Sequence, residues 1–200
     1  MTVFAKREAR PAVAQFILNR WSARAFTPVD ITQDALFDLL EAGRWAPSAY
    51  NSQPWRFIYA RRNTPDWERF LGLLIPFNRS WAENASAIVY IASSTTIPDS
   101  KTGEPVPAPS HAFDAGAASV LIQLQASQNG WNAHPVSGFE SELARASLEI
   151  PEDYALHAAL VIGRRGDGDS LLPESLRARE HPSGRNPLSA YAFEGRYQTR

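Results

Sequence analysis

Apolar side chains recur at intervals of three and four residues in four parts of the chain, as expected for one buried face of a helix. The helices predicted from this spacing span residues 12–19, 32–43, 64–74 and 111–129. Thr32 is a suitable N-cap for the second helix, because its hydroxyl can accept a backbone N–H bond. Asn129 and Gly130 end the fourth helix, since both residue types tolerate the left-handed backbone that closes many helices.

Short apolar runs between these helices predict β-strands. The predicted strands span residues 55–59, 87–92 and 158–162, and the second of them is apolar at every position. Helices that alternate with such strands indicate a protein of the α+β or α/β class, with a central sheet covered by helices. No internal repeat or linker divides the sequence, so residues 1–200 are predicted to form a single domain.

Three segments have neither helical nor strand periodicity. Residues 45–54 are mostly small, polar or proline and are predicted to form a loop. Residues 97–110 contain four prolines and are predicted to be irregular. Periodicity is also weak from residue 164 onward, although the tail keeps Leu188, Tyr191, Phe193 and Tyr197. We expect this tail to wrap onto a second surface, such as another subunit.

Composition narrows the class of protein. The chain is 44% hydrophobic and 20% charged, which is typical of a globular protein, and it contains no Cys. Its formal net charge of -1 provides no overall attraction to nucleic acid or to an anionic membrane. No apolar run is long enough to span a bilayer, and the N-terminus lacks the apolar region of a signal peptide. We therefore expect a cytoplasmic protein that has neither nucleic acid nor membrane as a partner.

Several kinds of catalytic site are not supported. The four His residues are scattered without the spacing of a metal site, so no metal ligand is predicted. The Gly-x-Ser-x-Gly sequence of a serine hydrolase and the Gly-Lys-Ser/Thr sequence of a phosphate-binding P-loop are both missing. Gly163, Gly166 and Gly168 follow a predicted strand, but their spacing indicates a turn rather than a dinucleotide loop.

The segment Arg20–Arg24 concentrates two guanidinium groups and a hydroxyl just after a predicted helix. Alternate residues of an extended chain share a face, so Arg20, Ser22 and Arg24 would converge, and arginine is well suited to binding phosphate. A second interpretation is a solvated turn whose arginines cap the helix or pair with Asp30. The segment alone leaves both interpretations open.

The loop at residues 45–54 adds a second set of polar groups. Asn51 and Gln53 each carry a hydrogen-bond donor and an acceptor, which is what the edge of a planar heterocycle requires. A structural loop with as many amides would need partners for all of them. These amides therefore favour a ligand-binding interpretation for both segments.

Together, Arg20-x-Ser22-x-Arg24 and the sequence Ala46-Pro47-Ser48-x-x-Asn51-x-Gln53-Pro54-Trp55 resemble the nitroreductase family of FMN-dependent oxidoreductases. Weaker features follow in the family's order, namely Asn78 with Trp81, Asp114-x-Gly116-Ala117, Pro135–Phe139 and Arg185. The resemblance implies an α+β fold, built as a three-layer α/β/α sandwich around a central mixed sheet. It also implies a homodimer with FMN at the interface and a C-terminal arm exchanged between the subunits.

The resemblance also assigns residues to the cofactor. They are Arg20, Trp21, Ser22, Arg24, Pro47, Ser48, Ala49, Asn51, Gln53, Asn78, Ser137, Gly138 and Arg185. Arg20 and Arg185 would contact the phosphate, and Ser22 and Arg24 would serve the phosphate, the ribityl chain and the O2 side of the ring. The residues from Pro47 to Asn51 would come from the partner subunit, with Gln53 close by. Asn78 would touch the pyrimidine edge, and Ser137-Gly138 would bring a backbone N–H near N5.

The implied reaction is the reduction of FMN by NADH or NADPH, followed by reduction of a small substrate such as a nitroaromatic or a quinone. The flavin would carry the chemistry, so no side chain is predicted to be catalytic. A non-catalytic flavin-binding protein stays open, as does a specialised reaction such as dehalogenation, dehydrogenation or flavin fragmentation. Several relatives have Lys where this chain has Trp81, so we expect an altered flavin potential or Arg24 as the sole charge near O2.

Overall fold

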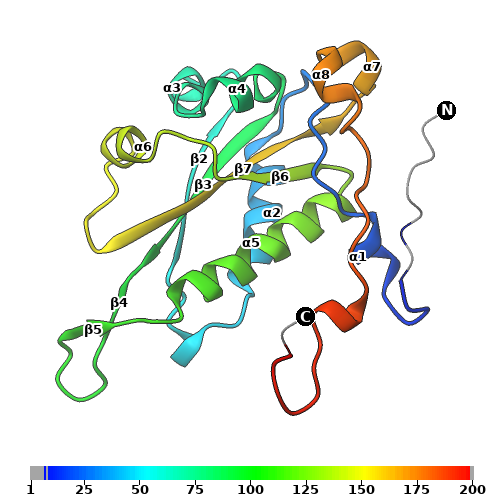
Figure 1. Ribbon diagram of the computed structural model, residues 1–200. Coiled ribbons are helices and arrows are strands. Elements are labelled where there is room, and N and C mark those ends of the chain that lie inside the picture. Colours follow the sequence, from blue (N-terminus) through cyan, green and yellow to red (C-terminus); the bar gives the residue numbers. More distant parts are fainter. Residues whose placement is uncertain (1–6, 8, 199–200) are drawn as a thin grey trace.

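The computed structural model describes residue 7 and residues 9–198. A five-stranded sheet forms its centre, with the strand order β1-β7-β3-β2 and with β6 also paired to β7 (Figure 1). The strands are β1 (Phe26–Thr27), β2 (Trp55–Arg61), β3 (Ala87–Ser94), β6 (Asn132–Val136) and β7 (Tyr154–Arg165). All three strands predicted from apolar runs are confirmed, and each is longer than predicted.

The central strand β3 explains why the sheet is covered on both faces. Successive side chains of a strand point to opposite faces, so an apolar residue at every position buries both. Ile88 and Tyr90 pack in one hydrophobic cluster, while Val89 and Ile91 pack in the other. All four side chains are at most 1% exposed. The predicted three-layer α/β/α arrangement is confirmed.

One face of the sheet is covered by α2 (Gln33–Arg44) and α5 (His111–Gln128), and α1 (Gln15–Asn19) packs on α5. The Thr32 hydroxyl caps α2 as predicted, because it accepts the backbone N–H of Ala35 at 3.1 Å. Gly43 allows the two long helices to approach closely, since a Cβ atom there would lie 2.7 Å from Cγ1 of Ile122. These helices form the layer on which the N-terminal segment rests.

The opposite face is covered by shorter helices, whose apolar side chains pack in the hydrophobic cluster that contains Ile88 and Tyr90. They are α3 (Trp67–Gly72), α4 (Pro76–Ala82), α6 (Ser141–Ser147), α7 (Gly168–Leu171) and α8 (Glu174–Arg177). The helix predicted over residues 64–74 is therefore confined to α3, and the one predicted over 12–19 is confined to α1. Among the described residues, no helix has the length and apolar character needed to cross a membrane.

The direction of the strands differs from the mixed sheet that we expected. Every pairing among the described strands is antiparallel. A parallel pair needs a connection that returns along the whole strand. The helices α3 and α4, which connect β2 to β3, instead stay at one end of the sheet, so β3 runs back beside β2 (Figure 1).

The prediction of an irregular segment at residues 97–110 is wrong in part. A small hairpin forms between β4 (Thr96–Pro98) and β5 (Pro105–Pro107). Its turn is closed by Asp99, whose side chain accepts the backbone N–H groups of Lys101 and Thr102 at 2.9 Å. Prolines are tolerated here because the hairpin is two-stranded and every strand is an edge.

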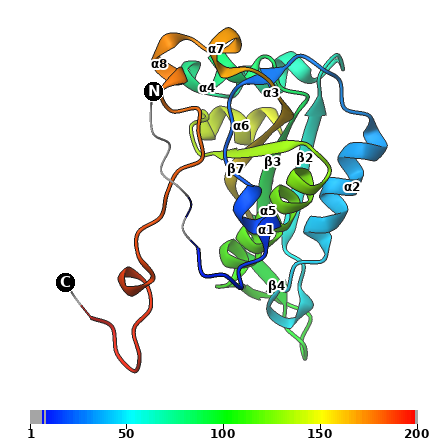
Figure 2. The ribbon, with the colours of Figure 1, turned by 90° about the vertical axis from the view of Figure 1, so that its right-hand side faces the viewer.

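The tail leaves β7, forms α7 and α8 against the core, and then continues as extended chain. Its last part, which includes η2 (Leu188–Ala190), projects away from the sheet and its helices in both views (Figure 2). Tyr191 is 61% exposed and Tyr197 is 81% exposed. Exchange of this arm with a second subunit stays a prediction.

Candidate functional site

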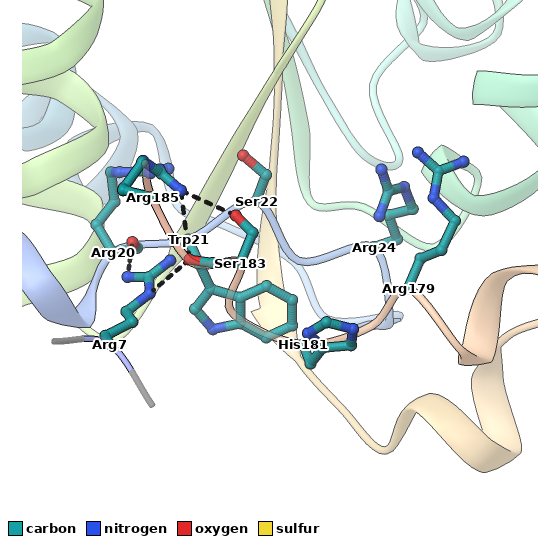
Figure 3. Close-up of a pocket in the computed structure, with 9 residues that line it drawn as sticks. All are labelled: Arg7, Arg20, Trp21, Ser22, Arg24, Arg179, His181, Ser183 and Arg185. Carbon is teal, nitrogen blue, oxygen red and sulfur yellow. Dashed lines mark hydrogen bonds between the residues drawn. The ribbon is translucent and has the colours of Figure 1, made fainter. Parts of the chain in front are cut away.

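A cavity of about 330 Å³ lies between the segment that follows α1 and the part of the tail that follows α8. The residues that line it are Arg7, Arg20, Trp21, Ser22, Arg24, Arg179, His181, Ser183 and Arg185. Figure 3 shows these side chains gathered from both ends of the sequence. The structure therefore brings together Arg20, Trp21, Ser22, Arg24 and Arg185, as the sequence predicted.

The segment from Arg20 to Ala25 is extended, which decides where its side chains point. Arg20 has the extended angles φ -70° and ψ 131°, and the residues between it and β1 belong to no helix. Trp21, Ala23 and Ala25 are buried, whereas Arg20, Ser22 and Arg24 are half-buried and border the cavity. The alternation of an extended chain thus leaves Arg20, Ser22 and Arg24 accessible from the cavity, and the largely buried Trp21 also contributes to its wall.

Three arginines gather at one end of the cavity. Arg7 donates to the backbone oxygen of Arg20 at 2.9 Å and also to that of Leu18. Arg185 donates to the Ser183 hydroxyl at 3.0 Å. Burial lowers the pKa of Arg20, and the nearby charges of Arg7 and Arg185 lower it further. This end of the cavity is therefore strongly positive.

Arg24 and Arg179 form the other end of the cavity, beyond the ring of Trp21 (Figure 3). Burial lowers the pKa of Arg24, the charge of Arg179 lowers it further, and the charge of Glu180 raises it. The Glu180 carboxylate accepts the backbone N–H groups of Arg24 and Ala25 at 3.0 Å. It therefore anchors the tail to the start of β1.

The charge of the cavity is unbalanced. Within the part of the chain that the structure describes, none of its five arginines forms an ion pair. Nη2 of Arg7 and Nε of Arg24 are buried there without a hydrogen-bond partner. Buried polar groups are normally hydrogen-bonded, and a phosphate offers acceptors that suit guanidinium groups. The site is thus suited to an anionic, phosphate-bearing ligand.

The alternative pairing of these arginines with Asp30 is wrong. The Asp30 carboxylate accepts the side-chain amide of Asn63, at 2.9 and 3.2 Å. Arg20 instead lies beside Gln123 of α5, with 3.5 Å between Nη1 and Oε1. Arg20 thus faces the cavity and α5, and the binding interpretation of the segment is favoured.

Trp81 lies in the core instead of on the cavity wall. It is 1% exposed and stacks on the ring of His134, with 4.8 Å between the ring centroids. The expectation that Arg24 would be the only charge at its end of the site is wrong, because Arg179 lies beside it. His134 contacts the Arg20–Arg24 segment from the core, since its Nδ1 lies 3.0 Å from the Ala23 oxygen. Trp81 in turn stacks on His134.

The buried His134 predicts a dependence of stability on pH. Burial is the main reason that the pKa of His134 falls from 6.5 to about 4, while the bond to Ala23 raises it and nearby arginines lower it. Between pH 6.5 and 4, His134 is protonated in the unfolded chain but stays neutral in the folded chain. The free energy of unfolding should therefore decrease by up to about 3 kcal/mol as the pH falls from 6.5 to 4.

Chemical denaturation at several pH values measures this effect. His134→Asn, which keeps a donor for the Ala23 oxygen but does not titrate, is the matched variant. It should show a flatter dependence than the unchanged chain between pH 6.5 and 4. Equal slopes for both proteins would contradict the assignment to His134.

Asn78 and Gly138 lie together on the other side of this core. The Asn78 side-chain amide donates to the Gly138 oxygen at 2.9 Å, and Asn78 is 7% exposed. A Cβ atom at position 138 would lie 2.5 Å from Nδ2 of Asn78, so the position requires glycine. Ser137 is exposed. The structure thus brings Asn78 and Gly138 together, but they are not among the described residues that line the arginine cavity.

The loop from Pro47 to Gln53 lies at a different place from the cavity. The backbone N–H of Ala49 donates to Asp114 near the start of α5, whereas Arg20 lies beside Gln123 near the end of the helix. The two residues are nine positions apart, or about 14 Å along a helix. A single chain therefore does not bring Pro47, Ser48, Ala49, Asn51 and Gln53 to the cavity.

The same loop is held in an unusual conformation. Tyr50, Asn51 and Gln53 have φ values of 54°, 54° and 48°, in the left-handed region. The backbone N–H of Gln53 donates to the Ser48 hydroxyl at 3.0 Å, and its side chain donates to the Asn51 oxygen at 3.1 Å. Tyr50 is 93% exposed. Strained backbone that local bonds hold in place is typical of binding loops.

Four residues of the cavity were missed from the sequence: Arg7, Arg179, His181 and Ser183. For the last three, the signal was the basic stretch at residues 177–185, and no sequence signal marked Arg7. The β4–β5 hairpin borders a second cavity of about 320 Å³, which also includes Arg56 and Tyr154. Among the described residues, no group of three His, Cys, Asp or Glu side chains could hold a metal ion.

Comparison with known proteins gives a consistent result. The family model described as "Nitroreductase family" matches residues 17–164. A crystal structure of an oxidoreductase that contains FMN is 39% identical, covers 100% of both chains and has a TM-score of 0.93. The putative NAD(P)H nitroreductase YdgI of Bacillus subtilis (strain 168) is 24% identical over an alignment of 186 residues, and the match covers 76% of this chain and 88% of that protein.

A shorter match concerns a reductase with a different named role. The CLA biosynthesis enone reductase of Lactiplantibacillus plantarum is 38% identical over 85 residues, which is 42% of this chain and 38% of that protein. The matched stretch is too short to compare whole proteins. It nevertheless shows that similar segments occur in an enzyme named for a conjugated carbonyl acceptor.

Proposed function

The chain belongs to the nitroreductase family, and from this premise we propose that it is an FMN-dependent oxidoreductase. It takes electrons from NADH or NADPH and reduces a small conjugated acceptor, such as a nitroaromatic or a quinone. The observation that carries the proposal is the cavity of five arginines without an ion-pair partner among the described residues. Such a cavity favours a phosphate-bearing cofactor.

The residues of the cavity fit FMN. Arg7, Arg20 and Arg185 would hold the phosphate, because three guanidinium groups converge there beside the Ser183 hydroxyl. Ser22 and Trp21 would border the ribityl chain. Arg24, whose Nε is buried without a partner among the described residues, would bond to the ring. The sequence assignments of Arg20, Ser22, Arg24 and Arg185 are thus kept as proposals.

Bound FMN would supply the redox chemistry, since it accepts two electrons from a nicotinamide and passes them to the acceptor. The chain's own residues bind and orient the reactants. Asn78 fixes the segment at Ser137-Gly138 through its bond to the Gly138 oxygen. We assign this segment to the ring side of the cofactor and name no catalytic side chain.

A second copy of the chain would complete the site. We propose a homodimer in which the loop from Pro47 to Gln53 of one subunit borders the FMN held by the other. The strained backbone of this loop and its distance from the cavity of its own chain support the proposal. The exposed tail from Leu188 to Tyr197 is the proposed exchanged arm. A cytoplasmic location stays a prediction from the sequence.

Anaerobic addition of NADH or NADPH to the FMN-loaded protein tests the proposed reaction. We expect the visible flavin absorption to bleach with at least one nucleotide and to return when a nitroaromatic, a quinone or a conjugated enone is added. Free FMN at the same concentration is the control. Bound FMN that no nucleotide reduces would instead support a non-catalytic flavin-binding protein, and reduction without turnover of any acceptor would support a specialised reaction.

A further inference from the structure

The five arginines of the cavity form two groups rather than one. Arg7, Arg20 and Arg185 affect one another, because the charges of Arg7 and Arg185 lower the pKa of Arg20. Arg24 and Arg179 form a separate pair, since the charge of Arg179 lowers the pKa of Arg24. Figure 3 shows the two groups on either side of Trp21. The cavity therefore offers two separate places for negative charge.

If the cavity holds FMN, the two groups of arginines face different parts of the cofactor. The phosphate is the only dianionic group of that cofactor, and the larger cluster of three guanidinium groups suits it better. The Arg24–Arg179 pair then faces the remainder of the cofactor, which is neutral when oxidised. Glu180 balances one of these two cations, and reduction of the flavin would provide a negative charge for the other.

Glu180 lies next to this pair and offsets only part of its charge, because its negative charge raises the pKa of Arg24 while Arg179 remains as a second cation. Its carboxylate oxygens are directed at the backbone N–H groups of Arg24 and Ala25, at distances of 3.0 to 3.1 Å. Neither Arg24 nor Arg179 forms an ion pair within the described residues. The positive field at this end of the cavity therefore persists.

Arg179 is also held in position by its neighbours in the chain. Leu176, three residues earlier, is 2% exposed and packs in the core. The backbone N–H of Arg179 donates to the Leu176 oxygen at 3.0 Å, and Glu180 follows as the anchor to β1. The side chain of Arg179 is exposed, but its backbone is thus held in place at the edge of the cavity.

We propose that Arg179 acts with Arg24 to stabilise the negative charge of the reduced flavin, and so raises the reduction potential of bound FMN. The inference rests on the proposed function. Transfer of two electrons and one proton from the nicotinamide oxidises it by two electrons and leaves one net negative charge on the flavin. Two cations beside the ring attract that charge and bind the reduced form more tightly than the oxidised form.

The reduction potential of bound FMN tests this role, measured together with the affinity for oxidised FMN. In Arg179→Gln, we expect the affinity for reduced FMN to fall about tenfold relative to that for oxidised FMN. This ratio corresponds to a midpoint potential about 30 mV lower for a two-electron couple. Arg179→Lys keeps the charge and should retain most of the potential of the unchanged protein.

Arg177→Gln is the matched control, because Arg177 is the last residue of α8, two positions before Arg179, but is not among the described residues that line the cavity. It removes the same charge and should leave the potential unchanged. An unchanged potential in Arg179→Gln, or an equal shift in Arg177→Gln, would overturn the inference. If the unchanged protein binds no FMN, the proposed function itself fails, so the two failures are distinguishable.

Discussion

Replacing Arg20 and Arg185 together by Ala weakens FMN binding by about 100-fold or more, because each removes a charge-assisted hydrogen bond of about 1.5–3 kcal/mol. The two residues line the same end of the cavity, where Arg7 is the remaining cation. Each single variant should lose about tenfold or more. Titration of FMN into the apoprotein, followed by quenching of flavin fluorescence, measures the effect.

Riboflavin is the ligand control for this prediction, since it lacks the phosphate. Its affinity should change little in the double variant, so the preference of the protein for FMN over riboflavin should disappear. Arg44→Ala is the protein control, because Arg44 lies on the exposed surface of α2 and pairs with Glu41. Equal losses for FMN and riboflavin would show that the two arginines do not bind the phosphate.

Charged substitutions on the outer face of α5 should abolish dimerisation and weaken FMN binding. Phe113 is 81% exposed and Val120 is 50% exposed, and Gly116 between them has open space around it. A second copy of the chain could cover this apolar stripe, which lies on the same helix as Asp114, the anchor of the loop at Ala49. The double variant Phe113→Glu and Val120→Glu places two charges in the proposed interface.

We expect this variant to be a folded monomer whose affinity for FMN is at least about tenfold weaker, because the partner's loop is missing. Light scattering coupled to size exclusion gives the mass, and the FMN titration gives the affinity. Leu143→Glu on α6 is the matched control, since Leu143 is 55% exposed on the opposite face of the sheet. A monomer that binds FMN normally would contradict the role of the second subunit.

The elements with the strongest apolar patterns were predictable. In β3 every position from residue 87 to 92 is apolar, as expected for a strand buried on both faces. In α2 and α5 the capping residues Thr32, Asn129 and Gly130 agreed with the apolar spacing. In these elements local preference and burial favour the same structure.

Other elements depend on contacts that no local pattern encodes. The strand β6 contains Pro135, which argues against a strand, but among the described strands β6 pairs with β7 alone, so its other side is an edge where proline is tolerated. The hairpin at Thr96–Pro107 likewise accommodates proline at its edges. The antiparallel direction of β3 depends on where α3 and α4 lie, and the sequence does not specify that position.

The part of the candidate site formed by the Arg20–Arg24 segment was predictable from the sequence. The spacing of Arg20, Ser22 and Arg24 made them candidates, because side chains alternate along an extended chain, and the loop at residues 45–54 with the family resemblance then favoured a binding site. Arg7 and Arg179 could not be found in this way. The position of Arg179 follows from the return of the tail to the start of β1, which depends on the bonds of Glu180. Arg7 is placed by its bonds to the backbone oxygens of Leu18, Arg20 and Ser183, which no local pattern encodes.

The central claim is that the arginine cavity binds FMN, and titration of FMN into the unmodified apoprotein tests it most directly. The account predicts saturable binding of one FMN per chain, a yellow complex, and weaker binding of riboflavin. A colourless protein that binds no added FMN would contradict the account.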